Sequence, residues 1–168
     1  NLNQLVLSEA IIDFLHKNIE SIPEELTRIG SLTLSGQFSG EHNGAMTAQG
    51  TIATGIGDAD INLHKSGNNQ FEGKITTEQF NLNQLMGNDS FGMLVADVSL
   101  SGQLHSGGKP DLTVNGIVSQ FDYNGYSFSN IDLNGTYSSR GYNGLVQIDD
   151  PHVKASLEGD FLLGDKGR

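Results

Sequence analysis

One short motif recurs along this sequence and constrains the fold more than any other feature. It consists of apolar, x, apolar, x, Gly, x, apolar residues, and all its copies follow Ser31. The copies are Leu32-Leu34-Gly36-Phe38, Met46-Ala48-Gly50-Ile52, Val98-Leu100-Gly102-Leu104, Leu112-Val114-Gly116-Val118, Ile131-Leu133-Gly135-Tyr137 and Ala155-Leu157-Gly159-Phe161. Apolar residues at every second position predict β-strands with one apolar face, because successive side chains of a strand point to opposite faces.

The residues between the apolar positions are polar. In the third copy they are Asp97, Ser99, Ser101 and Gln103. One face of the sheet is therefore expected to be apolar and the other polar. The motif glycine shares the parity of the apolar residues, so it faces the apolar side. Six such glycines predict that the sheet curls toward this side, because missing side chains relieve crowding on a concave face. Irregular strand ends in an ordinary sandwich are the alternative explanation.

Turn signals separate the predicted strands at short intervals. Hairpin candidates are Asn43-Gly44, residues 67–69, residues 107–110, Asn124-Gly125 and Asn143-Gly144. At Asn124-Gly125 the apolar positions change from odd to even numbers, as a two-residue turn requires. Short spacing between strands indicates an antiparallel meander rather than βαβ units.

The first thirty residues show helical spacing instead. Residues 8–19 follow a possible cap at Ser8, and Ser21 with Glu24 has capping-box spacing before a second helix that ends near Gly30. The predicted organisation is a short helical segment at 1–30 and a β-meander at 31–168. One further short helix is expected near 81–87. The predicted fold class is mainly β: a curled antiparallel sheet that forms an open trough.

Composition excludes several functions. A net charge of −11 over 168 residues disfavours nucleic-acid binding, because an acidic surface repels phosphate backbones. The absence of cysteine excludes disulfides, thiol catalysis and thiolate metal sites. No apolar run approaches the roughly 20 residues that span a bilayer. Because the chain starts at Asn1 and ends in a polar run, we expect it to be an internal piece of a longer protein.

The sequence contains no recognisable catalytic or metal-binding arrangement. Its five histidines are scattered without ligand spacing. The run Asp58-x-Asp60-x-Asn62 lacks the glycine and the glutamate of a calcium loop. Asp149 and Asp150 precede Pro151, which favours a solvated turn over an acid/base pair. We therefore expect no enzyme activity, no catalytic residue, no metal and no cofactor.

Several segments resemble the AsmA/TamB type of envelope protein, in the TamB-like versions found in Bacteroidetes. The resemblance covers nearly the whole chain and rests on repeated short motifs. They are LVLSEAIIDFL (5–15), PEEL (23–26), IGSL (29–32), LSGQFSG (34–40), GKITTEQFNLNQL (73–85), FDYNGYSFSNIDLNGTY (121–137), IDDP (148–151) and LEGDF (157–161).

This resemblance implies a section of a long open trough with a hydrophobic groove, in a parent protein that is anchored in the inner membrane and crosses the periplasm. The family is associated with phospholipid transport toward the outer membrane and with assembly of outer-membrane proteins through a barrel partner. The expected partners are therefore phospholipid acyl chains, an outer-membrane barrel assembly protein and the inner-membrane anchor of the parent. The anchor and the C-terminal domain of the family are absent from this sequence.

Candidate groove residues are those that share parity with the motif glycines. An ordinary closed β core is the alternative explanation for each of them. They are Leu32, Leu34, Phe38, Met46, Ile52, Val98, Leu100, Leu104, Leu112, Val114, Val118, Ile131, Leu133, Tyr137, Leu157 and Phe161.

The alternative function is a closed, sandwich-like module for surface binding or adhesion, with Phe121, Tyr123, Tyr126 and Tyr142 as contact residues. A further expectation concerns the last predicted strand, residues 153–161. It contains no proline and little protective charge, so weak self-association through this edge strand is predicted.

Overall fold

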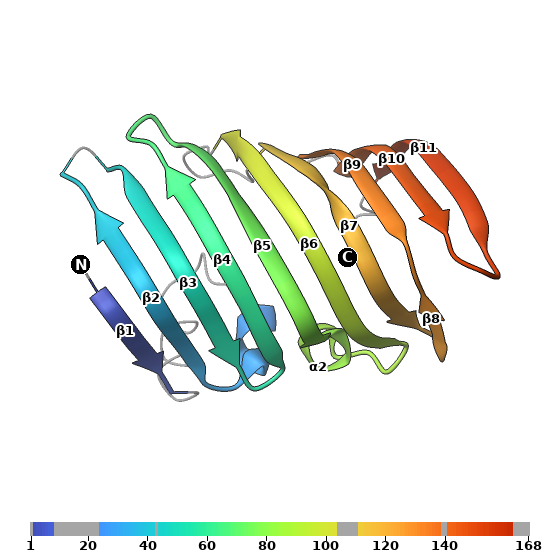
Figure 1. The fold of residues 1–168 in the computed structure, drawn as a ribbon, viewed down its shortest axis with the longest axis horizontal. Coiled ribbons are helices and arrows are strands. Elements are labelled where there is room, and N and C mark those ends of the chain that lie inside the picture. Colours follow the sequence, from blue (N-terminus) through green and yellow to red (C-terminus); the bar gives the residue numbers. More distant parts are fainter. Residues whose placement is uncertain (1, 9–23, 43, 104–110, 139–140, 163–168) are drawn as a thin grey trace, which may run out of the picture.

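A computed structural model shows the chain as one open antiparallel sheet (Figure 1). The structure describes residues 2–8, 24–42, 44–103, 111–138 and 141–162. The strand order is β1-β2-β3-β4-β5-β6-β7-β9-β10-β11, and β8 pairs with β7. The strands are β1 (Leu2–Leu7), β2 (Leu32–Gly40), β3 (Met46–Thr54), β4 (Gly57–Lys65), β5 (Gln70–Asn81), β6 (Phe91–Gln103), β7 (Asp111–Tyr123), β8 (Tyr126–Phe128), β9 (Ile131–Ser138), β10 (Gly141–Asp149) and β11 (Lys154–Leu162).

The predicted fold class, a mainly β open antiparallel sheet, is confirmed. Its register aligns the apolar positions of neighbouring strands in rows across the sheet. In one row Ile61 lies opposite Ile75, and Ile75 lies opposite Val98. Because directly opposed residues of antiparallel strands share a face, these rows build a continuous apolar face. Next to this row Thr76 lies opposite Asp97, in a row on the polar face.

Four of the motif glycines, Gly36, Gly50, Gly102 and Gly116, lie too close to the main chain of a neighbouring strand to carry a side chain, whereas a Cβ atom at Gly159 would meet no atom within 4 Å. Gly36 lies opposite Gly50, with φ values of 148° and 157°. A Cβ atom at Gly36 would lie 2.1 Å from the carbonyl oxygen of Gln49. Main-chain atoms of the neighbouring strand, and not side chains on a concave face, therefore exclude a side chain here.

Register shifts bend the sheet near one end of its central strands. One lies between Thr77 and Phe80 of β5, and β6 and β7 carry two further shifts near Leu94. A bulge bends its strand and increases the local twist. At these shifts the apolar side chains change from one set of alternate positions to the other along β5 and β7.

The prediction of a helical segment over residues 1–30 needs correction at its start. Residues Leu2–Leu7 form β1, in which Leu5 lies opposite Leu34 and Leu7 opposite Leu32. Their alternation adds two apolar residues to the apolar face, which favours a strand there. The first expected helix, at residues 8–19, lies almost entirely outside the described residues. Glu24–Ile29 forms a short 3-10 helix, η1.

The short helix near 81–87 is confirmed as α2 (Leu82–Met86). Asn81 caps its start by accepting a hydrogen bond from the backbone N–H of Asn83. Gly87 ends it in the left-handed conformation, with φ 61°. Leu85 packs against the buried Ile29 and Ile56, so α2 covers one corner of the apolar face.

The hairpin predictions are correct at Asn124-Gly125 and wrong at Asn143-Gly144. Asn124 and Gly125 have positive φ and bring Tyr123 opposite Tyr126. Asn143 and Gly144 lie inside β10, where Gly144 lies opposite a glycine on each neighbouring strand. Residues 67–69 connect β4 and β5, which pair with each other. Residues 107–110 and Asn43 lie outside the described residues.

The buried core is small for the size of the sheet. One cluster is formed by Ile29 and Ile56 beneath α2. The other is formed by Ala96, Val118 and Ile131 on β6, β7 and β9. Apart from Ile61, which is also buried, the other described apolar residues on this face are half-buried or exposed, and no second sheet covers them among the described residues. The sheet is therefore a single layer over most of its length.

Candidate functional site: an apolar hollow on the sheet

A hollow of about 420 Å³ lies on the apolar face. Five strands, β6 to β10, contribute to its wall. Its lining side chains are all aliphatic or aromatic: Leu94, Val118, Phe121, Tyr123, Phe128, Ile131, Leu133, Val146 and Ile148. A surface of this composition binds apolar groups by removing them from water, without a specific polar contact.

The base of the hollow is formed by buried residues. Val118 lies directly opposite Ile131, and each is 7% exposed. Ala96 lies opposite Val118 on the other side and packs into the same cluster. Leu133 and Val146, opposite each other in the next row, are only half-buried. Leu133 and Val146 therefore expose apolar surface that a ligand in the hollow can contact, next to the buried Val118 and Ile131.

Aromatic rings form one end of the hollow. Phe121 stacks on Tyr123 with ring centroids 6.1 Å apart and lies 6.4 Å from Phe128. Phe128 in turn meets Tyr126 edge to face at 4.6 Å, and Phe91 lies 5.3 Å from Tyr123. Such tilted and offset contacts are the preferred arrangements of aromatic pairs. The β7–β8 hairpin is thereby held over one end of the apolar face.

A buried carboxylate fixes the position of this hairpin. Asp150, 2% exposed, accepts hydrogen bonds from the Tyr126 hydroxyl and from the backbone N–H of His152 at 2.9 Å. Ser129 donates two more, from its backbone N–H at 3.0 Å and its hydroxyl at 2.8 Å. The expectation of a solvated turn at Asp149-Asp150 is therefore wrong for Asp150, because these partners close over it.

These hydrogen bonds determine the protonation of the cluster. The Tyr126 hydroxyl, followed by the backbone N–H of His152, holds the pKa of Asp150 well below its usual value. The same carboxylate raises the pKa of Tyr126. An ionised carboxylate with a low pKa is a weak base, so this geometry suits a structural lock on the turn better than proton transfer.

The register places the described candidate groove residues on the face that carries the hollow. Val118, Ile131 and Leu133 line it directly. The others extend from it across the sheet, and the most exposed are Met46, at 57%, and Leu157, at 49%. Leu104 lies outside the described residues. Phe161 belongs to β11, but its side chain is not described. The half-buried candidates are Leu32, Leu34, Phe38, Ile52, Val98, Leu100, Leu112, Val114 and Tyr137.

Six lining residues were not among the groove candidates: Leu94, Phe121, Tyr123, Phe128, Val146 and Ile148. Phe121 follows a bulge on β7, so a strict period of two from Gly116 misses it. Leu94 keeps the parity of Gly102 and lies beyond the copy of the motif that starts at Val98. Val146 and Ile148 alternate after Gly144, a signal that was hidden by the interpretation of Asn143-Gly144 as a turn.

The contact residues of the adhesion alternative have different environments. Phe121 faces the hollow, and the hydroxyl of Tyr126 is bonded to Asp150. Tyr123 is exposed, and the side chain of Tyr142 lies outside the described part of the chain. Phe121, Tyr123 and Tyr126 therefore belong to one aromatic cluster, and Tyr123 is its exposed member.

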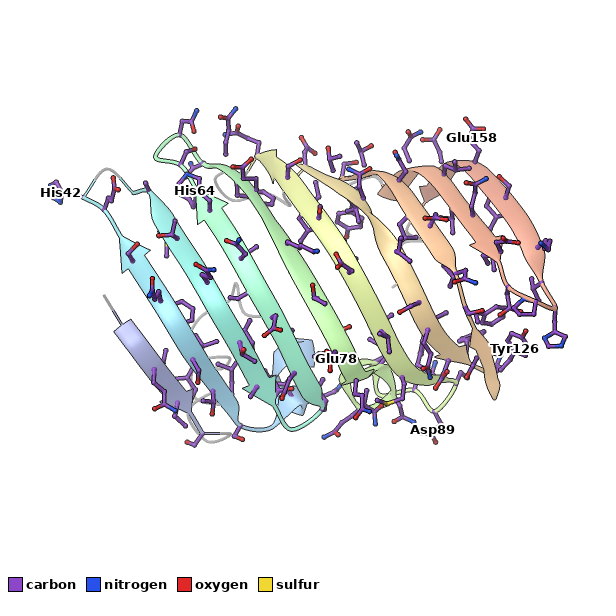
Figure 2. All side chains as sticks on the ribbon, in the orientation of Figure 1. His42, His64, Glu78, Asp89, Tyr126 and Glu158 are labelled. Carbon is purple, nitrogen blue, oxygen red and sulfur yellow. The ribbon has the colours of Figure 1, made fainter. Side chains whose placement is uncertain are left out.

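The opposite face of the sheet is polar and acidic. Lys74 pairs there with Asp97 at 2.8 Å, and both side chains are half exposed. Figure 2 shows His42, His64 and Tyr126 at separate places on the sheet. No group of three or more His, Asp or Glu side chains in the described ranges is placed to hold a metal ion.

A larger hollow, of about 1280 Å³, lies near the strand ends of β5, β6, β7 and β9. Its lining is mostly polar and includes Glu72, Asp111 and Asp160. Carboxylates in this position disfavour apolar or anionic occupants, so the smaller hollow is the better candidate for an apolar ligand. None of the helices in the described parts of the chain combines the length and apolar composition needed to cross a bilayer.

No protein-family model, curated protein or solved structure matches this chain. The resemblance to AsmA/TamB-type proteins therefore stays an expectation from the sequence, and the site is interpreted from its own geometry.

Proposed function

We propose that this chain binds lipid acyl chains on its apolar face and acts as a non-enzymatic lipid-conducting or scaffold segment. The observation that supports this most strongly is a hollow lined only by aliphatic and aromatic side chains, on a face that no described second layer covers. Each methylene group removed from water contributes about 0.8 kcal/mol, so a long acyl chain needs no polar anchor.

The size of the hollow fits one chain. A water molecule in the liquid occupies about 30 Å³, and a methylene group is of similar size. A hollow of about 420 Å³ thus has room for roughly a dozen such groups. A single acyl chain therefore matches the hollow better than a bulky, fused-ring lipid.

The apolar rows extend the proposal from binding to conduction. The row that contains Val118 and Ile131 continues on one side to Ile148 and Ala155. An isolated pocket would have a polar boundary on all sides, whereas this one opens onto further apolar positions. A bound chain can therefore move across the strands without entering water fully.

The family resemblance places this activity in a cellular context that forms part of the proposal. The parent would be an inner-membrane-anchored protein of the periplasm that carries phospholipid toward the outer membrane or assists an outer-membrane barrel assembly protein. The open trough and its apolar face agree with this role. The closed sandwich of the adhesion alternative differs from the open sheet, so that alternative would have to use an exposed surface.

The test is binding of a fluorescent fatty acid to the delipidated chain, together with native mass spectrometry after mild extraction. Leu133→Arg places a charge at the hollow, and Asn134→Arg places the same charge on the polar face one residue later. We expect Leu133→Arg to weaken binding about tenfold, equivalent to about 1.4 kcal/mol. Asn134→Arg should bind like the unmodified chain.

Folding has to be checked in both variants by circular dichroism. A folded, delipidated chain that binds neither fatty acid nor a hydrophobic dye contradicts the proposal. Equal binding by the two variants also contradicts it, because the ligand would then not occupy the hollow.

A further inference from the structure

The strand β11 forms one edge of the sheet. Along its whole length it pairs with β10, from Lys154 opposite Asp149 to Leu162 opposite Gly141. Among the described residues no strand pairs with its other side. It contains no proline, and Leu157 at its centre is 49% exposed. Such an edge presents unpaired backbone donors and acceptors to another strand.

We propose that β11 pairs antiparallel with β11 of a second copy of this chain, about a two-fold axis at Leu157. The two sheets then join into one continuous sheet with both apolar faces on the same side. This inference concerns the sheet edge and does not depend on lipid binding.

The two copies can pair only in registers that keep both apolar faces on the same side of the joined sheet. Opposed residues must share a face, so the two-fold axis has to pass through a residue and not between two residues. An axis at Glu158 sets this carboxylate opposite its own copy, and an axis at Gly159 sets Glu158 opposite Asp160. Like charges directly opposite each other destabilise a strand pair, which disfavours both registers.

Two registers remain that bring opposite charges together. An axis at Ser156 pairs only residues 154–158 and sets Lys154 opposite Glu158. An axis at Leu157 pairs residues 154–160 and sets Lys154 opposite Asp160. By symmetry this contact forms twice. The second register combines the longer ladder with charge complementarity, so we assign it to the dimer.

Both charged groups are accessible for this contact. Lys154 lies on the exposed surface 2.6 Å from Asp149, and its ammonium group has further N–H donors. Asp160 accepts a hydrogen bond from Asn143 at 2.7 Å through one oxygen. The contacts within one copy are exposed, and exposed pairs of this kind contribute little.

Charge variants test the register. Lys154→Glu and Asp160→Lys each create two like-charged pairs in the homodimer, so sedimentation velocity should show dimer dissociation constants about tenfold higher. In an equimolar mixture of the two variants, the heterodimer contains two opposite-charged pairs. The mixture should therefore associate as the unmodified 168-residue chain does.

Single cysteines give a second test, because the chain has no cysteine of its own. In Leu157→Cys the two sulfurs lie directly opposite each other and should form an inter-chain disulfide under mild oxidation. In Ala155→Cys the new residue lies opposite Gly159 of the other copy, on the same face, and should not crosslink. Dithiothreitol should reverse the Leu157→Cys crosslink.

These experiments are done on delipidated protein without detergent. A chain that stays monomeric at all accessible concentrations overturns the proposal. Association that the mixture of charge variants does not restore, or that crosslinks equally through both cysteines, overturns the assigned edge and register.

Discussion

Asp150 is a buried carboxylate that links separate parts of the chain by hydrogen bonds. Its carboxylate joins the β10–β11 turn to Tyr126 of β8 and to Ser129, which leads into β9. Its partners are 21 and 24 positions away in the sequence, so local pattern gives no sign of them. The sequence suggested a solvated turn because two adjacent carboxylates before a proline usually lie in water.

The dependence of the free energy of unfolding on acid pH tests the contribution of the Asp150 hydrogen bonds. The pKa of Asp150 is lowered in the folded chain, so its contribution is present above the unfolded value of about 3.9 and is lost as the pH falls below it. Tyr126→Phe removes the largest cause of the lowered pKa. We expect this variant to be less stable than the unmodified chain at pH 6 in urea, with a smaller difference at pH 2.5.

Tyr123→Phe, which changes an exposed ring on the same hairpin, should have little effect at either pH. A stability difference for Tyr126→Phe that is the same at both pH values would show that Asp150 does not depend on this bond.

At Gly36 and Gly50 the main chain of the neighbouring strand excludes a side chain, a cause that the sequence motif does not reveal. Gly50→Ala would place a Cβ 2.0 Å from the carbonyl oxygen of Ser35, whereas a Cβ at Gly40 meets no atom within 4 Å. We expect Gly50→Ala to lower the free energy of unfolding by about 1 kcal/mol or more. Gly40→Ala should be nearly neutral. Equal effects in urea unfolding would contradict the close approach of β2 and β3.

Among the elements, strands follow from the sequence more reliably than their exact pairing. Alternation defined the apolar face because each strand has a period of two, and Gly87 correctly marked the end of α2. The bulges were not predictable, since one extra residue leaves no signature in composition. One of them moves the parity on β7 between Val118 and Phe121, which is why Phe121 was missed as a lining residue of the hollow.

The corner under α2 offers a test at the scale of elements. Ile56, in the β3–β4 turn, is buried against Ile29 of η1. Ile56→Ala should lower the free energy of unfolding by about 2 kcal/mol, at the low end for a buried isoleucine because much of this cluster is only partly buried. Ile117→Ala removes the same atoms from a side chain that is 53% exposed on the polar face.

The Ile117→Ala control should change the free energy of unfolding by less than about 0.5 kcal/mol. If Ile56→Ala were equally mild in denaturant unfolding, η1 and α2 would not be docked on the sheet as described.

At the scale of the whole molecule, the described chain is one open sheet whose two faces differ in polarity. One face is acidic and polar, and the other consists of apolar rows from β1 to β11 over a small core. A closed domain of similar length would bury most of its apolar side chains, whereas here most of them are partly exposed. The proposed function follows from this exposure.

The most direct test is to locate a bound acyl chain by NMR with a spin-labelled fatty acid. Methyl groups of Leu133, Val146 and Ile131 line the hollow, and those of Ile117 and Leu145 lie on the polar face. The proposal predicts that the label broadens the first group and spares the second. Unchanged spectra, or equal broadening of methyl groups on both faces, would contradict the claim that the apolar face is the lipid-binding surface.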